Sequence, residues 1–405
     1  MKSVDEHLAQ CLQGVRPLPP VELPLLDAAG CVLAERVTSS WDLPRFDNSA
    51  MDGYAVRAAD VAVATTGEPV RLKVIADIAA GSNVSTRVAP ATCARIMTGA
   101  PMPPGADAVV PVEWTDGGTD VVHIDQPADL GAHVRRTGDD LSAGSVVLAA
   151  GTVLRPAHLG LLAAVGRSWV LGHPRPRVVV LATGDELVQP GVEPGVGQIT
   201  DSNSFLLVSA ARAAGAVAER VEPVVDDADL VLAALEHAAA RSDVLVTTGG
   251  VSAGAYDVVK EVLTRVGTVR FDRVAMRPGM PQGHGVMGAT PLFTLPGNPV
   301  SAFVSFEVFV RPVLRRLAGR DPVLRRLVPA VLGASATSAN GKREYLRATL
   351  TTMDDGLVAT ALTGQGSHQL ATLARADGLI VVPEDVTAMS AGEQVDVLTL
   401  DEGER

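Results

Sequence analysis

The chain has few cysteines, no excess of positive charge and no long apolar run. Its 405 residues include three cysteines, Cys11, Cys31 and Cys93, which lie far apart without a C-x-x-C pair. This spacing indicates neither a disulfide framework nor a zinc ribbon and favours a reducing cytoplasm. The formal net charge of -12 argues against binding to nucleic acid or an anionic membrane, because phosphate surfaces require clustered Lys and Arg. We therefore expect any anionic ligand to be held locally.

Several common sequence signals are also missing. No apolar run approaches the length of a membrane span, and Asp5 and Glu6 stand where a signal peptide would need an apolar core. The chain contains no P-loop motif, no G-x-G-x-x-G after a strand and no H-E-x-x-H helix, and its eight histidines show no ligand spacing. These absences argue against membrane insertion, against a P-loop that binds nucleoside triphosphates and against a zinc site on a helix.

The organisation of the chain indicates several domains, since 405 residues with 47% hydrophobic content can bury more than one core. Residues 4–11 have helical spacing, and short β-branched runs between 70 and 148 predict a small β domain without an obvious helix. From Pro174 the pattern changes to buried strands alternating with helices, which predicts a doubly wound α/β domain. A long helix over 300–318 precedes further short strands, which predict a carboxyl-terminal β domain.

Two loops of the α/β domain follow buried strands and should lie at the carboxyl ends of the sheet, where ligands bind in such folds. The first, TGDEL, places Asp185 and Glu186 side by side, and these suit a metal or a substrate, although such an Asp also caps turns. The second, TGGVSAG, offers backbone N–H groups of Gly249, Gly250 and Ser252 to an anionic oxygen, although it also reads as a tight turn before a helix.

Further candidate residues follow in the same domain. Arg273 and Arg277 could clamp an oxyanion, although spacing alone is as compatible with two surface arginines. The segment LPGNPVS stiffens a turn with two prolines, and its backbone could approach a ligand. The residues that we assign to this turn are Pro296, Gly297, Asn298 and Pro299.

Eight motifs in order carry a resemblance to a known family. They are NSAMDGYAVR, RIMTGAPMPPGADAVVPVE, RRTGDDL, ATGDEL, GQITDSN, TTGGVSAGAYDVVK, VAMRPGMPQG and LPGNPVSAFVSFE. Together they span almost the whole chain, and in this order they resemble the molybdopterin molybdenumtransferase family, known in bacteria as MoeA and related to the E domain of gephyrin. Eight motifs in one order make accidental agreement very improbable.

The resemblance implies a multidomain fold with α/β and β parts. Its four parts are an extended, discontinuous amino-terminal linker domain, a β insert domain, a doubly wound molybdopterin-binding α/β domain and a carboxyl-terminal β-barrel-like domain. The corresponding boundaries are 1–45 with 137–176, 46–136, 177–325 and 326–405. The resemblance also implies an elongated homodimer whose cleft lies between the α/β domain of one subunit and the amino-terminal domains of the other.

Site residues can be carried over motif by motif. From the insert side the resemblance implies catalytic roles for Asp52, Thr98 and Asp140, and from the α/β domain for Glu186 and Asp257. It implies substrate contacts by Asp226, for which Asp227 is an equally good alignment, and by Arg273, Arg277, Arg347 and Ser367. Glu186 and Asp257 would also hold the metal.

The implied reaction inserts molybdate into adenylylated molybdopterin with release of AMP. A carboxylate-held Mg²⁺ would polarise the pyrophosphate-type bond while cations neutralise charge, and no protein nucleophile is needed. Contact with the molybdopterin adenylyltransferase is a further implied partner. Two departures from the family pattern concern charge: Met280 replaces a lysine of MKPGKP, and Ala255 stands where many relatives carry an acidic residue.

Two other functions remain open at this point. One is adenylylation of molybdopterin, because the related adenylyltransferase shares the α/β domain, but the four-part layout favours the insertion step. The other is a non-catalytic binding or scaffold protein, which the Met280 departure keeps open and which the retained Asp52, Glu186 and Asp257 argue against.

Overall fold

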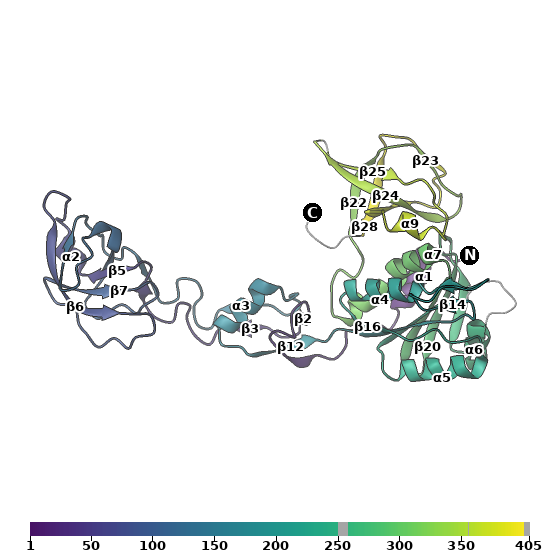
Figure 1. The fold of residues 1–405 in the computed structure, drawn as a ribbon, viewed down its shortest axis with the longest axis horizontal. Helices are drawn as coiled ribbons and strands as arrows, with labels where there is room; N and C mark the ends of the chain where they lie inside the picture. Colours follow the sequence, from purple (N-terminus) through teal and green to yellow (C-terminus); the bar gives the residue numbers. More distant parts are fainter. Residues whose placement is uncertain (250–257, 355, 401–405) are drawn as a thin grey trace. The chain divides into compact units, whose positions relative to one another are not determined.

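The computed structural model describes residues 1–249, 258–354 and 356–400. By its internal contacts the chain divides into two compact units, which Figure 1 shows coloured along the sequence. Unit 1 comprises Met1–Leu23, Gly30–Ala34 and Leu171–Arg405, and unit 2 comprises Pro24–Ala29 and Glu35–Val170. Three separate stretches of chain therefore build unit 1.

The main body of unit 2 is a five-stranded sheet in the order β8-β5-β7-β6-β9. Its strands are β5 (Gly53–Val56), β6 (Val70–Ile78), β7 (Thr92–Ile96), β8 (Ala108–Pro111) and β9 (Val121–Ile124). Tyr54, Val110 and Ile124 are buried in its core. Between residues 70 and 148 the only helical element of the described chain is a 3₁₀ turn, η1 (Val112–Trp114), so the predicted small β domain is confirmed. A short helix, α2 (Ala58–Val61), precedes this stretch.

The rest of unit 2 consists of short antiparallel pairs and one helix. β4 (Asn48–Ser49) pairs with β10 (Val134–Arg135), and β3 (Val37–Thr38) pairs with β11 (Val146–Leu148). The helix α3 (Pro156–Ala164) begins with a proline at its first position, where the missing N–H costs no hydrogen bond. In unit 1, β2 (Val32–Leu33) pairs with residues 172 and 173 of β12 (Trp169–His173), and β1 (Val21–Pro24) follows the first helix along the chain.

The predicted amino-terminal helix is present as α1 (Val4–Leu12). It begins with a capping box, in which the Glu6 backbone N donates to Ser3 Oγ over 3.1 Å and the Ser3 backbone N donates to Glu6 Oε2 over 2.8 Å. Both bonds satisfy N–H groups that the first turn of a helix leaves unpaired. Val4 and Cys11 are buried on the face of α1 that packs against the rest of unit 1.

The α/β part of unit 1 is a six-stranded sheet in the order β16-β13-β17-β21-β20-β18. The parallel strands are β13 (Arg177–Ala182), β16 (Val217–Arg220), β17 (Val244–Thr248) and β21 (Thr290–Leu295). β18 (Val269–Arg273) and β20 (Pro281–Met287) extend the sheet in antiparallel pairing, because residues 288 and 289 alone connect β20 to β21. The sheet is therefore mixed at one edge, which the helix–strand alternation had not indicated.

Helices cover both faces of this sheet, as the doubly wound prediction requires. α4 (Asn203–Ala213) packs on one face and α5 (Ala228–Ala239) and α6 (Val258–Val266) on the other, as Figure 1 shows. Successive strand residues separate accordingly: Val178 and Val180 join the core with α4, while Val179 and Leu181 join the core with α5 and α6. Strands buried on both faces explain why the sequence runs there are continuously apolar.

The predicted helix over 300–318 is present but contains a wide turn. It consists of α7 (Pro299–Ser305), a π-helical turn η2 (Phe306–Val310) and α8 (Arg311–Leu317) in succession. Pro312 has no backbone N–H and cannot bond the carbonyl one turn earlier, which accounts for the wider turn directly before it. Across the residues that the structure describes, no helix is long and apolar enough to traverse a bilayer.

The carboxyl-terminal part of unit 1 is a closed five-stranded barrel, drawn in yellow-green in Figure 1. Its strands are β22 (Leu327–Leu332), β24 (Arg343–Met353), β25 (Gly356–Ala361), β26 (Gly378–Val382) and β28 (Gln394–Thr399). β19 (Met276–Arg277) pairs with β24, β23 (Ala336–Thr337) pairs with β27 (Ala388–Met389), and α9 (Leu370–Leu373) lies between β25 and β26 in sequence. The barrel confirms the predicted β-barrel-like domain.

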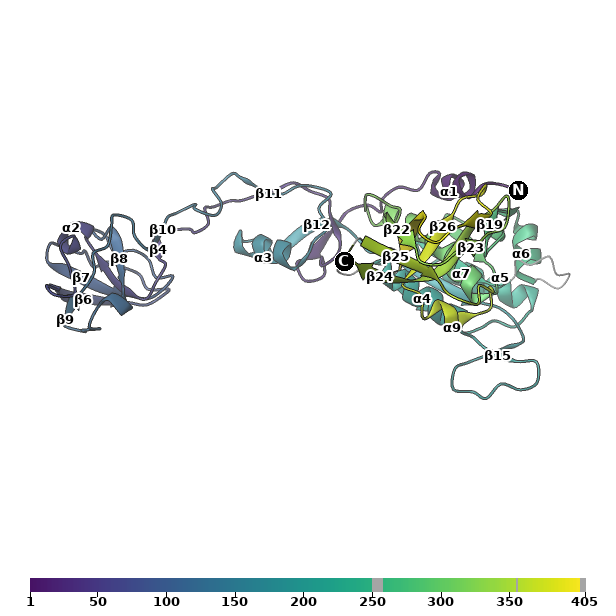
Figure 2. The ribbon, with the colours of Figure 1, turned by 90° about the horizontal axis from the view of Figure 1, so that it is seen from above.

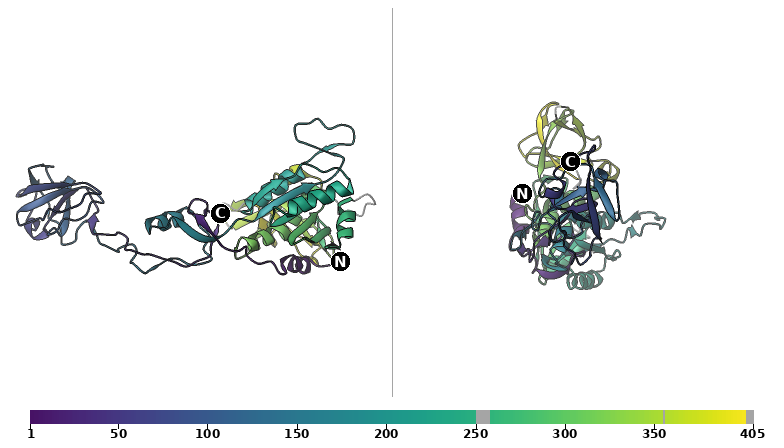
Figure 3. Two further views of the ribbon diagram at one scale, coloured as in Figure 1. Left: turned by 90° about the horizontal axis from the view of Figure 1, so that it is seen from below. Right: turned by 90° about the vertical axis from the view of Figure 1, so that its left-hand side faces the viewer.

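One long loop leaves the α/β part after β13. It begins with β14 (Leu187–Val188) and ends with β15 (Ile199–Thr200), which pair with each other. Figures 2 and 3 show this loop projecting from the rest of unit 1. Its two arms return to the sheet beside the end of β13, where the candidate site lies.

Candidate functional site

Three loops of unit 1 converge at the carboxyl ends of β13, β17 and β21. The Gly249 backbone N donates to Leu295 O over 3.1 Å, which joins the end of β17 to that of β21. Gly249 has φ +88°, and a Cβ there would lie 3.4 Å from Thr183 O. A Cβ on Gly297 would lie 3.7 Å from the Cα of Gly249. The glycines therefore let the three backbones approach one another, as a site that holds a ligand against backbone requires.

A cavity of about 100 Å³ lies between these loops. Whole-ligand pockets usually enclose roughly 300–1,000 Å³, so this one suits a phosphoryl-sized part of a larger ligand. The residues that line it include Thr183, Glu186, Asp201, Asn203, Thr248, Gly249, Gly297 and Pro299. The predicted Glu186, Gly249, Gly297 and Pro299 are thus brought together.

Asn203 ties two of the loops together. From the first turn of α4 its Nδ2 donates to Thr248 Oγ1 over 2.9 Å and to Gly297 O over 2.7 Å. Its Oδ1 is buried and accepts no hydrogen bond within the described chain. Asn203 is the last residue of the GQITDSN motif and was not predicted as a site residue; its position directly before a helical run was the signal that could have identified it.

Asp201 is a second residue that the sequence analysis missed. It is 1% exposed, and its carboxylate accepts hydrogen bonds from Ser204 N over 3.0 Å and from Ser204 Oγ. Arg220 Nη2 lies 3.7 Å from Asp201 Oδ2, so the buried charge has a cationic partner. The Asp201 backbone N donates to Val188 O, which fixes the returning arm of the long loop beside Glu186.

The acidic residues after β13 and β16 separate into structural and exposed groups. Asp185 Oδ1 accepts a hydrogen bond from Asp226 N over 3.0 Å, which links the two loops. Asp227 caps α5, since its Oδ1 accepts from Asp229 N and from Leu230 N, each over 3.0 Å. Glu186 is exposed, and its carboxylate lies over Gly184 at the edge of the cavity. Both Asp226 and Asp227 are exposed, and the capping hydrogen bonds to α5 are what distinguish Asp227.

The two predicted arginines do not line this cavity, since Arg273 ends the edge strand β18 and Arg277 lies in β19, which pairs with β24 of the barrel. Arg277 Nε is 3.3 Å from Glu344 Oε1, a carboxylate that is 3% exposed and also accepts from Ser338 Oγ. Arg273 is exposed, and its Nη2 lies 3.3 Å from Met280 Sδ. Met280, which departs from the family pattern, therefore contacts one of the two candidate cations.

The barrel contributes a loop to the start of α7. Arg347 is 1% exposed, and its guanidinium donates to Gly366 O over 3.0 Å and to Gly364 O over 2.9 Å. This loop places Ser367 so that Asn298 Nδ2 donates to its Oγ over 3.0 Å and Val300 N donates to its carbonyl over 3.0 Å. Arg347 thus shapes the loop, and Ser367 together with Asn298 lies at the ligand-facing turn.

The candidates from the insert side all lie in unit 2. Thr98 donates to Asp52 Oδ1 twice, from its backbone N over 2.7 Å and from its Oγ1 over 2.9 Å. These bonds, first the backbone one and then the hydroxyl one, lower the pKa of the exposed Asp52 carboxyl. Asp140 is exposed on a loop whose backbone N donates to Leu43 O over 2.9 Å. Asp52 and Thr98 therefore form one group.

Three predicted residues, Gly250, Ser252 and Asp257, lie outside the described residues. Within residues 1–249, 258–354 and 356–400, no group of three or more His, Cys, Asp or Glu side chains is arranged to hold a metal ion. Glu186 is the exposed carboxylate that lines the cavity. The described lining therefore leaves space against the backbone at Gly249 and Gly297, with the Asn203 Oδ1 acceptor unpaired and the Glu186 carboxylate at the edge, while the Gly249 N–H and the Asn203 Nδ2 group are already bonded within the protein.

Three family models together match most of the chain. Family models match residues 2–166 (MoeA N-terminal region, domain I and II), 179–316 (probable molybdopterin binding domain) and 329–400 (MoeA C-terminal region, domain IV). Molybdopterin molybdenumtransferase 2 of Mycobacterium tuberculosis is 48% identical, covering 99% of this chain and 100% of its own. The molybdopterin molybdenumtransferase of Bacillus subtilis is 35% identical, covering 93% and 89%.

Solved structures show the same likeness. Two molybdopterin biosynthesis MoeA proteins from Pyrococcus horikoshii align with TM-scores of 0.80 and 0.76 at 32% and 28% identity. The first alignment covers 99% of both chains, and the second covers 98% of this chain and 100% of the other. The resemblance predicted from eight ordered motifs is thereby confirmed, and the chain belongs to the molybdopterin molybdenumtransferase family of transferases.

Proposed function

We propose that this protein inserts molybdate into adenylylated molybdopterin and releases AMP, the step that completes the molybdenum cofactor. The observation that carries the proposal is the cavity at the ends of β13, β17 and β21, which combines two close glycines with the exposed Glu186. A ligand with a phosphate group and a metal-binding requirement suits this combination. Relatives of matching length carry the corresponding name.

The residues around the cavity have distinct proposed roles. Gly249 and Gly297 leave room for a phosphate oxygen against the backbone, and Asn203 keeps their two loops in register through its paired donations. Asn298 and Ser367 offer a hydrogen-bonded pair at the turn before α7. Arg273 and Arg277 are proposed to neutralise molybdate or phosphate charge, as guanidinium groups do through paired N–H donors.

A divalent metal is part of the same proposal, and the residues present fit Mg²⁺. This ion is usually held by one or two carboxylates together with substrate phosphates and water, so a cluster of three side chains is not required. Glu186 lines the cavity and is exposed, and we propose that it holds the ion together with Asp257. When bound, Mg²⁺ would supply Lewis acidity and positive charge at the phosphoanhydride that releases AMP.

The proposal extends to assembly and location. We propose a homodimer, together with a contact to the adenylyltransferase that makes the substrate. Specific activity that falls on dilution in parallel with dissociation, measured by light scattering, would support the dimer. The three cysteines are buried and form no disulfide, which supports a reducing cytoplasmic location.

The test is AMP release from adenylylated molybdopterin by the purified full-length protein with molybdate and Mg²⁺. We expect AMP release that depends on both ions, together with cofactor that activates an apo-molybdoenzyme. Tight pterin binding without turnover would overturn the proposal in favour of a non-catalytic paralogue. Formation of adenylylated molybdopterin from molybdopterin and ATP would instead assign the adenylylation step.

A further inference from the structure

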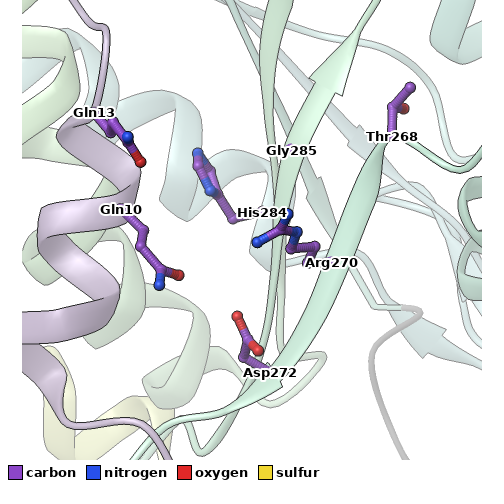
Figure 4. Close-up of a pocket in the computed structure, with 7 residues that line it drawn as sticks. All are labelled: Gln10, Gln13, Thr268, Arg270, Asp272, His284 and Gly285. Carbon is purple, nitrogen blue, oxygen red and sulfur yellow. The ribbon is translucent and has the colours of Figure 1, made fainter.

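A second pocket lies between α1 and the antiparallel edge of the α/β sheet, away from the candidate site. It encloses about 320 Å³, and Figure 4 shows the side chains of α1, β18 and β20 that line it. It shares no lining residue with the cavity at the carboxyl ends of β13, β17 and β21. Its size is within the range of pockets for small organic ligands, roughly 300–1,000 Å³.

The pleat of β18 explains why polar side chains gather there. Thr268, Arg270 and Asp272 alternate along the chain and so share one face, whereas Val269 and Phe271 pack into the core on the other side. Thr268 and Arg270 are exposed, so this polar face of the strand reaches solvent beside α1. The pocket is therefore open and polar, and a water-soluble ligand can reach it.

β20 adds a histidine next to the arginine. Arg270 lies directly opposite His284 in the antiparallel register, so the two side chains are cross-strand neighbours on this face. In Figure 4 both point into the space between strand and helix, toward Gln10 of α1 and Gln13 directly after it. Donors from three elements therefore converge on one space.

Part of the polar lining is already paired. Lys2 Nζ lies 2.6 Å from Asp272 Oδ2 and 2.7 Å from Gln10 Oε1, so the one carboxylate of the lining has a cationic partner. The Gln10 carbonyl is engaged by the same ammonium, which leaves its Nε2 group to donate elsewhere. Lys2 thus removes most of the negative charge that would repel an anion from the pocket.

The remaining donors have no protein acceptor within the described chain. Arg270 makes no hydrogen bond or ion pair there, and Gln13 makes no side-chain hydrogen bond. The His284 ring makes no hydrogen bond within the described chain, and it packs against Phe293 and His7, with 5.0 Å and 6.3 Å between ring centroids. His7 is itself 1% exposed, and its Nδ1 accepts and donates no hydrogen bond. A guanidinium, an imidazole and two carboxamides therefore face the pocket with unused hydrogen-bonding capacity.

We propose that this pocket binds a small organic anion, whose carboxylate or phosphate group lies between Arg270 and His284. The guanidinium supplies the charge-assisted pair of N–H donors that such groups accept. Gln10 and Gln13 donate to the polar remainder of the ligand. The volume excludes a whole dinucleotide and exceeds what an inorganic ion fills, so the ligand is a molecule of metabolite size.

The test uses the full-length protein and three probes, ribose 5-phosphate, citrate and neutral ribose. Binding is followed by calorimetry and by the imidazole C–H NMR signal of His284, which is assigned by its loss in His284→Gln. We expect at least one of the two anions to bind and to shift this signal, and ribose to do neither. Absence of binding by both anions at about 10 mM, roughly ten times a millimolar dissociation constant, overturns the proposal.

Matched variants separate the pocket from general charge effects. Arg270→Met should weaken anion binding roughly tenfold or more, because hydrogen bonds to charged groups each contribute about 1.5–3 kcal/mol. Arg265→Met removes an exposed arginine of α6 that lines no part of the pocket and should leave binding unchanged. Gln13→Leu provides a second variant that keeps all charges and should weaken binding by a smaller factor. Binding that is equal in wild type and Arg270→Met contradicts the proposal.

Discussion

The acidic loop after β13 and the acidic loop of the insert fix their carboxylates differently. In the insert, a single neighbour, Thr98, donates to Asp52 with both its backbone N and its hydroxyl. After β13, Asp185 takes up the linking hydrogen bond to the next loop, and the adjacent Glu186 stays exposed at the cavity. In the TGDEL motif one acidic residue, Asp185, links two loops, and its neighbour Glu186 is left at the cavity. In the insert, Asp52 has no acidic neighbour in its motif, and Thr98 fixes its carboxylate.

The largest effect is expected at the exposed carboxylate. Glu186→Gln keeps the size of the side chain but removes the charge proposed to hold Mg²⁺, so the rate of AMP release should fall about 100-fold or more. The variant should unfold at the wild-type temperature, because this side chain lies at an exposed edge. Steady-state kinetics over a range of Mg²⁺ concentrations and calorimetric unfolding measure the two quantities. Wild-type kinetics in Glu186→Gln would remove this carboxylate from the proposed site.

Asn203 is expected to have the next largest effect because it joins the ends of β17 and β21 beside the cavity. Asn203→Leu removes two donations and should cost about 2 kcal/mol of stability, since each net hydrogen bond contributes roughly 1 kcal/mol. The same change should raise the KM for adenylylated molybdopterin, because Gly297 and Thr248 lose their common partner. Denaturant unfolding and initial-rate kinetics measure both. Asn203→Asp is the control for size, and an unchanged KM in both variants would show that the loops hold their register without this residue.

Asp226 and Asp227 are neighbours and both exposed, but only Asp227 caps a helix, so they form a matched pair. Asp227→Ala removes the cap of α5 and should destabilise the protein by about 1 kcal/mol while leaving the rate of AMP release unchanged. Asp226→Asn leaves the cap intact and should lower the rate with little change in stability. Thermal unfolding and kinetics on both variants decide the matter. If Asp227→Ala lowers the rate and Asp226→Asn does not, Asp227 is the substrate-binding residue and Asp226 is not.

Much of the fold followed from sequence because its signals are local. The buried strand at 177–182 and the helix at 4–12, expected over 4–11, follow from apolar runs and apolar spacing, although the capping box of the helix was not predicted. The antiparallel edge and the π turn were missed, since they depend on a two-residue connection and on how the helix accommodates Pro312. Periodicity registers neither of these features.

The candidate site was predictable only in part for a related reason. Motifs at strand ends identified Glu186, Gly249 and Gly297, because the topology of parallel sheets brings such ends together. Asn203 acts across 45 and 94 residues of sequence, and no local pattern records such contacts. The distinction between Asp226 and Asp227 likewise depends on which carboxylate reaches the first turn of α5, a matter of backbone direction rather than composition.

The smallest effect is expected at Thr98, whose hydrogen bonds to Asp52 can be tested through the pKa of the Asp52 carboxyl. Hydrogen bonds from Thr98 favour the charged form of Asp52 and lower its pKa, and the backbone bond is the larger cause. Thr98→Val removes only the hydroxyl, so the pKa of Asp52 should rise part of the way toward its ordinary value while remaining below it. Because the carboxylate is then retained over a narrower range, any acid limb of the activity profile that depends on Asp52 should move to higher pH.

The measurement is a carboxyl ¹³C titration of Asp52 in full-length protein, with the signal assigned by Asp52→Asn. Thr98→Ser restores the hydroxyl and should return the pKa toward that of the wild type, which separates the hydrogen bond from any change in shape. Because Asp52 is exposed, the effect on folding stability should be close to zero and the rate at neutral pH should change by about twofold at most. An Asp52 pKa that is equal in wild type and Thr98→Val would mean that the backbone N–H alone fixes this carboxylate, and the insert loop would then resemble the Asp185 loop, which also relies on a backbone donor.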